Sequence, residues 1–308
     1  MHSQPKVALT RCASYGADIL PTQLDAVLGA AGFTPSAGAR VLVKPNLVSA
    51  RKGPLACSQP EVVAAACRWL MDHDCRITVA DSPAFGTAAG VAEKCGIAQA
   101  LKPLGLTVTG LGNARALPLS FGETIGLSAQ SRAQDAILNL PRLKAHCQMR
   151  VTGAVKNLFG CVAGMRKALA HTRFGEQGNR FEAMLLDVLD ALPPVITVLD
   201  GVVCMHVTGP TGGAPFPLGL LGASASPVAL DTAAYLALHL SPADVPLWRE
   251  AQSRGIPGAQ PEDPQYPLDT PEAFDADGFV IPGRLDPVAF APLRLAQSAM
   301  KRVCEKFR

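Results

Sequence analysis

The sequence lacks the short motifs that identify the commonest cofactor and metal sites. Its nine cysteines are separated by long, irregular intervals, and no C-x-x-C occurs in the 308 residues. This spacing argues against a zinc ribbon, a thioredoxin-like dithiol and a self-contained 4Fe–4S ferredoxin motif. A P-loop, a G-x-G-x-x-G turn after an early strand and a G-x-S-x-G elbow are also missing. Ordinary nucleotide binding and serine hydrolase chemistry are therefore disfavoured.

Aromatic residues and net charge are also scarce. Only 5% of the residues are aromatic and the formal net charge is +3, which argues against a nucleic-acid partner. No apolar run reaches the roughly 18 to 20 residues that cross a membrane. The N-terminal stretch MHSQPKVALTRC lacks the apolar region of a signal peptide. We therefore expect a cytoplasmic protein with no nucleic-acid and no membrane partner.

Hydrophobic residues make up 48% of the chain, enough to bury a substantial core. Short apolar segments alternate with segments of helical spacing, which is typical of βαβ units. We predict an α/β fold with a mainly parallel sheet and helices on both faces, because the expected strands are apolar on both sides. The expected strands are 6–12, 40–43, 76–80, 106–109, 136–140, 195–199 and 218–223. The expected helices are 20–31, 58–73 with Ser58 as N-cap, 87–101, 181–192 and 227–240.

Two regions differ from this alternation. Residues 115–131 are less regular and suggest a small antiparallel excursion. The composition changes after about residue 241, where residues 257–271 are rich in proline and acidic residues and indicate a long loop. We expect a short strand at 279–281 and a C-terminal helix at 286–306. The predicted organisation is an α/β domain of residues 1–240 and a C-terminal extension of residues 241–308 that packs on it.

A glycine-rich basic segment, VTGAVKNLFGCVAGMRKALAH at 151–171, is the strongest indication of a site. Glycine lets a backbone approach a ligand, and the cations favour an anionic one. Polar residues also follow several expected strands, and parallel strands end on one edge of an open sheet. Turns and helix caps use the same residue types, which is the alternative explanation. The candidate ligand-binding residues are Lys44, Asn46, Lys144, Gly153, Lys156, Asn157, Gly160, Arg166 and, in a second flexible loop at 209–213, Gly212.

Four polar residues are candidates for acid–base chemistry. His146 or His171 would transfer a proton, because histidine alone titrates near neutral pH without perturbation. Asp81 or Asp200 would orient a cation or act as a base. A metal ion is an open alternative, because mixed histidine and cysteine ligands suit several transition metals. Its candidate ligands are His146, Cys161, His171 and His206.

Four stretches of the sequence resemble the DUF362 family, a domain of unknown function. They are VLVKPN at 41–46, NLPRLKAH at 139–146, TGAVKNLFG at 152–160, and LDGVV at 199–203 with GPTGG at 209–213. The resemblance covers roughly residues 38–240. Many members of this family carry a ferredoxin-like segment with two cysteine runs for iron–sulfur clusters, and this chain lacks that segment.

A looser similarity concerns the segment that contains Lys156 and the downstream His171. It is similar to the cofactor-holding region of lactate-racemase-like proteins, in which a nickel-pincer nucleotide is tethered through a lysine. That resemblance makes Lys156 and His171 the positions to compare.

Taken together, these patterns predict an anion-binding cleft. They favour an enzyme that acts on or with a phosphorylated or carboxylated small molecule, and they assign no cofactor. One alternative is a metal- or iron–sulfur-associated redox protein with an electron-transfer partner. The other is a non-catalytic module that binds a small anionic ligand.

Overall fold

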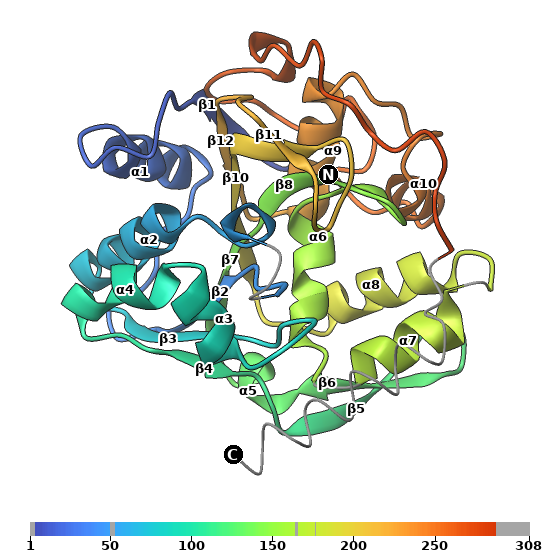
Figure 1. Cartoon of the computed structure of the whole chain (residues 1–308), viewed down its shortest axis with the longest axis horizontal. Helices are drawn as coiled ribbons and strands as arrows, with labels where there is room; N and C mark the ends of the chain where they lie inside the picture. Colours follow the sequence, from blue (N-terminus) through green and yellow to red (C-terminus); the bar gives the residue numbers. More distant parts are fainter. Residues whose placement is uncertain (1–3, 50–52, 164–165, 176, 288–308) are drawn as a thin grey trace.

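The computed structural model describes residues 4–49, 53–163, 166–175 and 177–287. Its centre is a large sheet that is seen nearly edge-on in Figure 1, with helices on both sides. The main strands are β1 (Ala8–Arg11), β2 (Arg40–Pro45), β3 (Arg76–Asp81), β4 (Val108–Gly110), β7 (Ala136–Leu140), β10 (Val195–His206) and β12 (Leu220–Ser224). Three further strands extend this sheet: β8 (Arg142–His146), β9 (Arg150–Thr152) and β11 (Ala214–Phe216).

The strand order is β1-β12-β10-β7-β2-β3-β4. Neighbours from β10 to β4 run parallel, whereas β12 is antiparallel to both β1 and β10. The predicted α/β class with a mainly parallel sheet is therefore confirmed. The irregular region after β4 forms a separate antiparallel pair, β5 (Ala114–Pro118) and β6 (Thr124–Ser128), as expected.

Helices cover both faces of the sheet, as its apolar strands require. One face carries α1 (Leu20–Ala30), α2 (Pro60–Asp72), α3 (Ala88–Lys94) and α4 (Ile97–Leu101). The other carries α6 (Ala154–Asn157), α7 (Arg166–Phe174), α8 (Arg180–Asp190), α9 (Pro227–Ala237) and α10 (Pro246–Ser253). Within β2, Val41 and Val43 pack in the core on the α1–α2 side, and Leu42 packs in the core that contains α8. This alternation buries both faces of a central strand.

Several expected boundaries were wrong. The strand expected at 195–199 continues to His206, so Asp200 lies within β10 rather than at its end. The helix expected at 87–101 is divided into α3 and α4 at Gly96, whose φ of 82° is left-handed. Ser58 does not cap α2, whose N-cap is Gln59. Instead, the Ser58 hydroxyl donates to Leu140 O at 2.5 Å and accepts the Asn46 N–H at 2.7 Å.

The segment that follows α9 contributes to the core. Trp248 of α10 packs in one apolar cluster with Tyr235 of α9, Phe274 and Ala276. Residues 279–281 do not form the expected strand. Their backbone is tied to the end of β10 instead, where Val207 N–H donates to Val280 O at 2.7 Å. The helix expected at 286–306 falls outside the described residues except at its first two positions, and a domain boundary at residue 240 stays a prediction.

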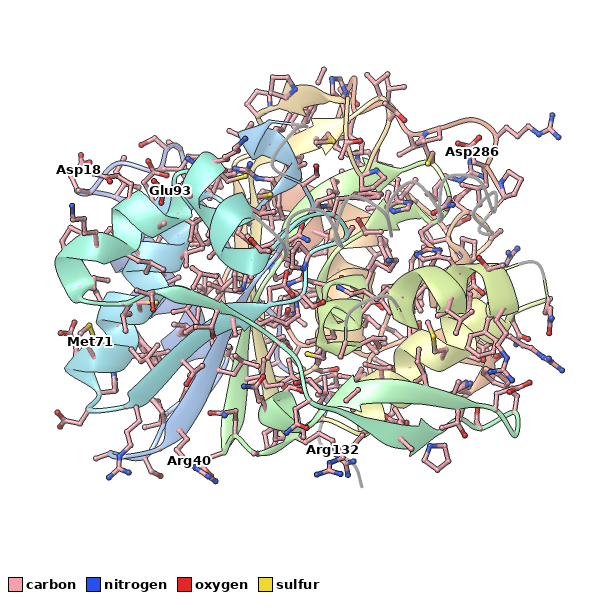
Figure 2. All side chains as sticks on the ribbon, turned by 60° about the horizontal axis from the view of Figure 1, so that its bottom comes forward. Asp18, Arg40, Met71, Glu93, Arg132 and Asp286 are labelled. Atoms are coloured by element: carbon pink, nitrogen blue, oxygen red, sulfur yellow. The ribbon has the colours of Figure 1, made fainter. Side chains whose placement is uncertain are left out.

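The two edges of the sheet differ in chemistry. Arg40, at the amino end of β2, projects at the periphery in Figure 2 and forms an exposed ion pair with Asp135 at 2.7 Å. Lys44, four residues along the same strand, is completely buried at the opposite edge. Among the described residues, no helix combines the length and apolar character of a membrane span.

Candidate functional site

A buried ion pair lies at the carboxyl ends of β2 and β3. Lys44 Nζ lies 2.8 Å from Asp81 Oδ1, and the two side chains are 0% and 2% exposed. The ammonium also donates to Pro45 O at 3.1 Å. Asp81 Oδ2 accepts the Leu47 N–H at 2.9 Å. The pair therefore joins two neighbouring strands and fixes the chain where it leaves β2.

Gly160 leaves room for this ion pair. It belongs to the 3₁₀ helix η3 (Leu158–Cys161). An ideal Cβ at this position would overlap Asp81 Oδ1 and the Nζ and Cε atoms of Lys44. In the structure, the space beside this glycine is thus filled by side chains of the protein itself.

Gly153 likewise leaves room for a charged side chain, that of Asp231 in α9. The Asp231 carboxylate accepts the N–H groups of Ala154 at 2.6 Å and Val155 at 2.9 Å. These are two donors at the start of α6 that have no partner within the helix. An ideal Cβ on Gly153 would overlap Asp231 Oδ1. Burial raises the pKa of Asp231 to about 7, and the two backbone N–H groups act in the opposite direction.

Lys144 and Asn46 come together from β8 and the end of β2. Lys144 is 4% exposed, and its ammonium donates to Asn46 Oδ1 and, at 2.9 Å, to Ala56 O. Burial lowers the pKa of Lys144 to about 8. Arg142 and Lys44 lower it further, whereas Cys57 and Asp81 raise it.

Cys57, which no sequence motif singled out, lies close to Lys144. The buried Cys95 thiol donates to Cys57 Sγ at 3.3 Å. This contact lowers the pKa of Cys57 to about 6 against the effect of burial, and the charge of Lys144 acts in the same direction.

Both carboxylate oxygens of Asp200 interact with side chains of the protein itself. It lies opposite Arg142 in the register of β10 and β8. Arg142 Nε is 3.2 Å from Asp200 Oδ2, and the Tyr15 hydroxyl donates to Asp200 Oδ1 at 2.8 Å. Burial raises the pKa of Asp200, while Arg142 and Tyr15 lower it. These contacts give Asp200 a structural role at the centre of the sheet.

Lys156 presents a partly buried amine without an anionic partner among the described residues. Its Nζ lies 4.6 Å from the centre of the Phe159 ring and 5.6 Å from that of Phe181. Within the described residues it has neither a hydrogen bond nor an ion pair. Burial lowers the pKa of Lys156 to about 7, and the charges of Lys167, Lys144 and Lys44 act in the same direction. We refer to Lys44, Lys144, Lys156 and Lys167 as the lysine cluster.

Two histidines border the lysine cluster. His146 is 5% exposed, and its Nδ1 accepts the Gln148 N–H at 3.1 Å. Burial lowers the pKa of His146 well below its ordinary value, and Lys156, Lys144 and His171 lower it further. His171 packs on the same two rings as Lys156, with centroids 5.5 Å from Phe159 and 4.5 Å from Phe181.

The other sequence candidates have different surroundings. Asn157 is buried and donates to Asn139 Oδ1 at 2.8 Å, which ties α6 to β7. Gly212 has a left-handed φ of 82° and open space around it. The loop that contains it lies against the end of β8, where Cys147 N–H donates to Gly209 O at 3.0 Å. The side chain of Arg166 lies outside what the structure describes.

The candidate metal ligands do not form one group. Nowhere in the described ranges do three or more histidine, cysteine, aspartate or glutamate side chains gather as metal ligands. His206 lies against Phe216 and Phe279, and its Nδ1 accepts the Val280 N–H at 3.3 Å. Burial raises the pKa of Cys161 to about 11.

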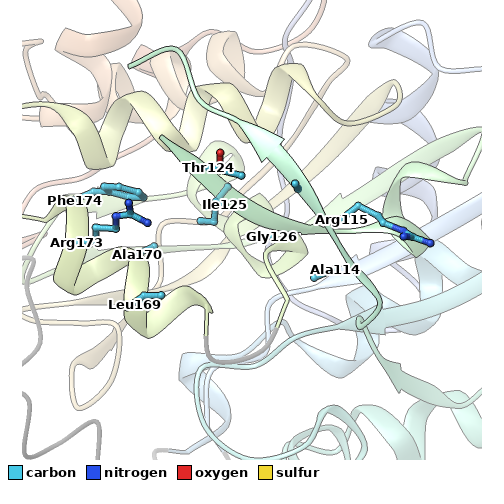
Figure 3. Close-up of a pocket in the computed structure, with 10 residues that line it drawn as sticks. Ala114, Arg115, Thr124, Ile125, Gly126, Leu169, Ala170, Arg173 and Phe174 are labelled. Atoms are coloured by element: carbon cyan, nitrogen blue, oxygen red, sulfur yellow. The ribbon is translucent and has the colours of Figure 1, made fainter. Parts of the chain in front are cut away.

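A cavity of about 260 Å³ lies between the β5–β6 hairpin and α7 (Figure 3). Thr124, Leu169, Arg173 and Phe174 are among the residues that line it. No candidate residue from the sequence is among them, and Arg173 is paired with Glu123. The cavity is therefore distinct from the lysine cluster.

The sequence indicated most of the cationic groups, with Lys167 among the basic residues of 151–171, but Cys57 and Asp231 were not among the candidates. Lys167 donates to Ser82 O from α7. Asp231 could have been found, because it is the one charged residue in the otherwise apolar helix sequence PVALDTAAYLA. A lone buried carboxylate needs a partner. Cys57 gave no comparable indication.

The fold and the site define an α/β protein with buried lysines at the carboxyl edge of its sheet. The family model described as "Domain of unknown function (DUF362)" matches residues 41–235. The Thylakoid-associated protein sll1697 of Synechocystis is 35% identical over 306 residues, which cover 98% of this chain and 95% of that protein. The chain belongs to the DUF362 family, as its sequence motifs indicated.

Two solved structures are more distantly similar. The lactate racemase apoprotein from Thermoanaerobacterium thermosaccharolyticum has a TM-score of 0.40 and 10% identity, covering 65% of this chain and 51% of that one. A Thermotoga maritima protein from structural genomics has a TM-score of 0.39 and 11% identity, covering 62% and 53%. Structural similarity at this level does not support an inference about activity.

Replacing Asp231 with alanine is expected to destabilise the protein. The change leaves the buried N–H groups of Ala154 and Val155 without an acceptor, which costs about 2–4 kcal/mol at roughly 1–3 kcal/mol for each lost group. Urea unfolding gives the free energy directly. Asp72→Ala, at an exposed position, is the control and should change stability by less than about 0.5 kcal/mol. Equal stability of the two variants would show that the cap is unimportant.

Gly160→Ala is expected to disrupt the Lys44–Asp81 pair, because the new methyl group overlaps both charged groups. Overpacking at a rigid position costs about 1–3 kcal/mol. The matched control is Gly29→Ala within α1, where an ideal Cβ meets nothing within 4 Å. That change should stabilise by about 0.5–1 kcal/mol. Thermal unfolding that moves both variants in the same direction would contradict this account of Gly160.

Proposed function

We propose that this protein binds a small phosphorylated or carboxylated molecule at the lysine cluster and acts on it as an enzyme. The observation that supports this most directly is the partly buried amine of Lys156, which lies against two aromatic rings. Within the described part of the chain it has aromatic neighbours and other cations but no carboxylate. A bound anion would supply the missing countercharge.

The balance of charge around the lysine cluster supports the same conclusion. The carboxylate of Asp81 is paired with Lys44, and that of Asp200 is paired with Arg142. Lys144 lies near Cys57, whose pKa is lowered to about 6, whereas Lys156 has no anionic neighbour among the described residues. A desolvated ammonium group without countercharge either loses a proton or attracts an anion. The pKa values of Lys144 and Lys156 are lowered mainly because burial makes their charged forms less stable. An anion bound beside them would raise both values again.

Proton transfer has a suitable group beside the amine. His146 is held by the Gln148 N–H at Nδ1, so its neutral ring carries the proton on Nε2. Its lowered pKa keeps it neutral at pH 7. A neutral imidazole can both donate and accept a proton, which suits acid–base chemistry on a bound anion.

Lys156→Gln is expected to weaken the binding of inorganic sulfate, used as the probe anion, by about 10- to 100-fold. This range corresponds to the loss of one charge-assisted hydrogen bond. Isothermal titration calorimetry at fixed low ionic strength measures the affinity. Lys102→Gln removes an exposed lysine and should leave it unchanged. If Lys156→Gln binds sulfate as tightly as the wild type, the proposed site is wrong.

The affinity for sulfate should fall as the pH rises from 6 to 9. Sulfate does not titrate in this range, whereas the pKa of Lys156 is lowered to about 7 and that of Lys144 to about 8. Each loses its positive charge above its pKa, so binding weakens first near pH 7 and again near pH 8. The other charged or titratable groups that face Lys156 are Lys44 on β2, His146 on β8, and Lys167 and His171 on α7.

In Lys156→Gln, the first of these two decreases should disappear while the second remains. Calorimetric titrations at half-unit pH intervals separate the two steps. A wild-type affinity that is constant from pH 6 to 9 would contradict the assignment of the binding charge to these lysines.

A further inference from the structure

The amine of Lys156 is held in an environment unlike that of an ordinary structural lysine. Two aromatic rings, Phe159 and Phe181, lie 4.6 Å and 5.6 Å from its Nζ. The ring faces attract the cationic form but offer no lone pair to accept its protons. The lone pair of the neutral form is likewise not used in any hydrogen bond within the described ranges. The nitrogen is therefore available for a bond to a ligand.

Surrounding cations favour the neutral form of this amine. Lys44, Lys144 and Lys167 approach it from three different elements: β2, β8 and α7. Their charges and burial lower the pKa of Lys156 to about 7. Desolvation together with a neighbouring cation is the arrangement that makes a lysine nucleophilic near neutral pH.

The same cations can hold a second, anionic part of a substrate. Lys144 uses two of its three ammonium protons on Asn46 Oδ1 and Ala56 O, so one proton remains for another acceptor. The pKa of His146 is lowered by burial and then by the charges of Lys156 and Lys144, so the imidazole lies within the electrostatic influence of both groups. One region of the site thus contains an available amine, a cation with a free donor and a neutral imidazole.

From this juxtaposition we infer that Lys156 forms an imine with a small anionic carbonyl compound, an aldehyde or ketone that also carries a carboxylate or a phosphate. The inference rests on the proposed anion site and specifies the substrate class that this site takes.

The reaction needs no oxidant and no reductant. The nitrogen lone pair attacks the carbonyl carbon, and the electron pair of the C=O double bond moves to oxygen, which takes up a proton. The resulting carbinolamine loses a proton from nitrogen and expels its hydroxyl group as water, which leaves a C=N bond to Lys156. His146 is the group placed to move these protons, and Lys144 holds the anionic end of the molecule.

Reductive trapping tests this inference on the full chain. The protein is incubated at pH 7.5 with sodium cyanoborohydride and either pyruvate or dihydroxyacetone phosphate, and the modified residues are identified by peptide mass spectrometry. We expect Lys156 to be modified at least about tenfold faster than Lys94 and Lys102, which are exposed. Comparison of the two compounds shows whether the site prefers a carboxylate or a phosphate.

Two controls connect the reaction to the site. Sulfate should slow the modification of Lys156 without affecting Lys94 or Lys102, because it competes only at the lysine cluster. Hydroxyacetone, which has the carbonyl group but no charge, should modify Lys156 more slowly than either anionic compound. Equal rates at Lys156 and the exposed lysines with all three compounds would overturn the inference.

Variants at position 156 separate this inference from the proposed function. Lys156→Arg keeps a positive charge but provides no amine that forms an imine, so it should retain sulfate binding and give no adduct at this position. Lys156→Gln should lose both. Circular dichroism and urea unfolding verify that each variant is folded. Sulfate binding that depends on Lys156 without any trapped adduct would overturn the imine and leave the anion site, whereas sulfate binding that is independent of Lys156 would overturn both.

Discussion

The ion pair between Lys44 and Asp81 is the contact on which the carboxyl edge of the sheet depends. It joins β2 to β3 where both strands end, and it holds the backbone at Leu47. Because neither side chain is accessible to water, removing one partner would leave an uncompensated buried charge, which typically costs about 3–5 kcal/mol. Gly160 is compatible with this pair only because it lacks a side chain. The lysine cluster is built around this fixed point.

Burial, together with repulsion among neighbouring cations, gives the site its chemical character. Lys44 is neutralised by Asp81, but Lys144 and Lys156 lie in the same buried region without a carboxylate of their own among the described residues. Their lowered pKa values show that the folded protein keeps these amines between the charged and the neutral state near physiological pH. Under the proposed function, a small anion that binds here supplies the countercharge that these buried amines lack.

Much of the fold was predictable, because alternating apolar strands and helices have few arrangements other than a parallel sheet. Lys44 and Lys144 follow expected strands, so their positions toward one edge of the sheet were predictable, whereas Lys156 was indicated by the glycine-rich basic segment. The environment of single residues was not predictable. Asp200-Gly201 resembles a turn, yet β10 continues through it because Arg142 on β8 compensates the buried carboxylate. Gly153 and Gly160 indicate a close neighbour, but sequence alone cannot show that these neighbours are Asp231 and the Lys44–Asp81 pair.

The cap that Asp231 provides for α6 also has a consequence for the order of folding. The carboxylate and the Ala154 N–H that it accepts are separated by 77 residues of chain. A helix as short as α6 is not stable by itself in water, so its first turn gains this support only after α9 has docked. During synthesis, α6 and the amine that it carries therefore emerge well before the residue that fixes them. The segment that bears Lys156 takes its final geometry late, once the chain as far as α9 has left the ribosome.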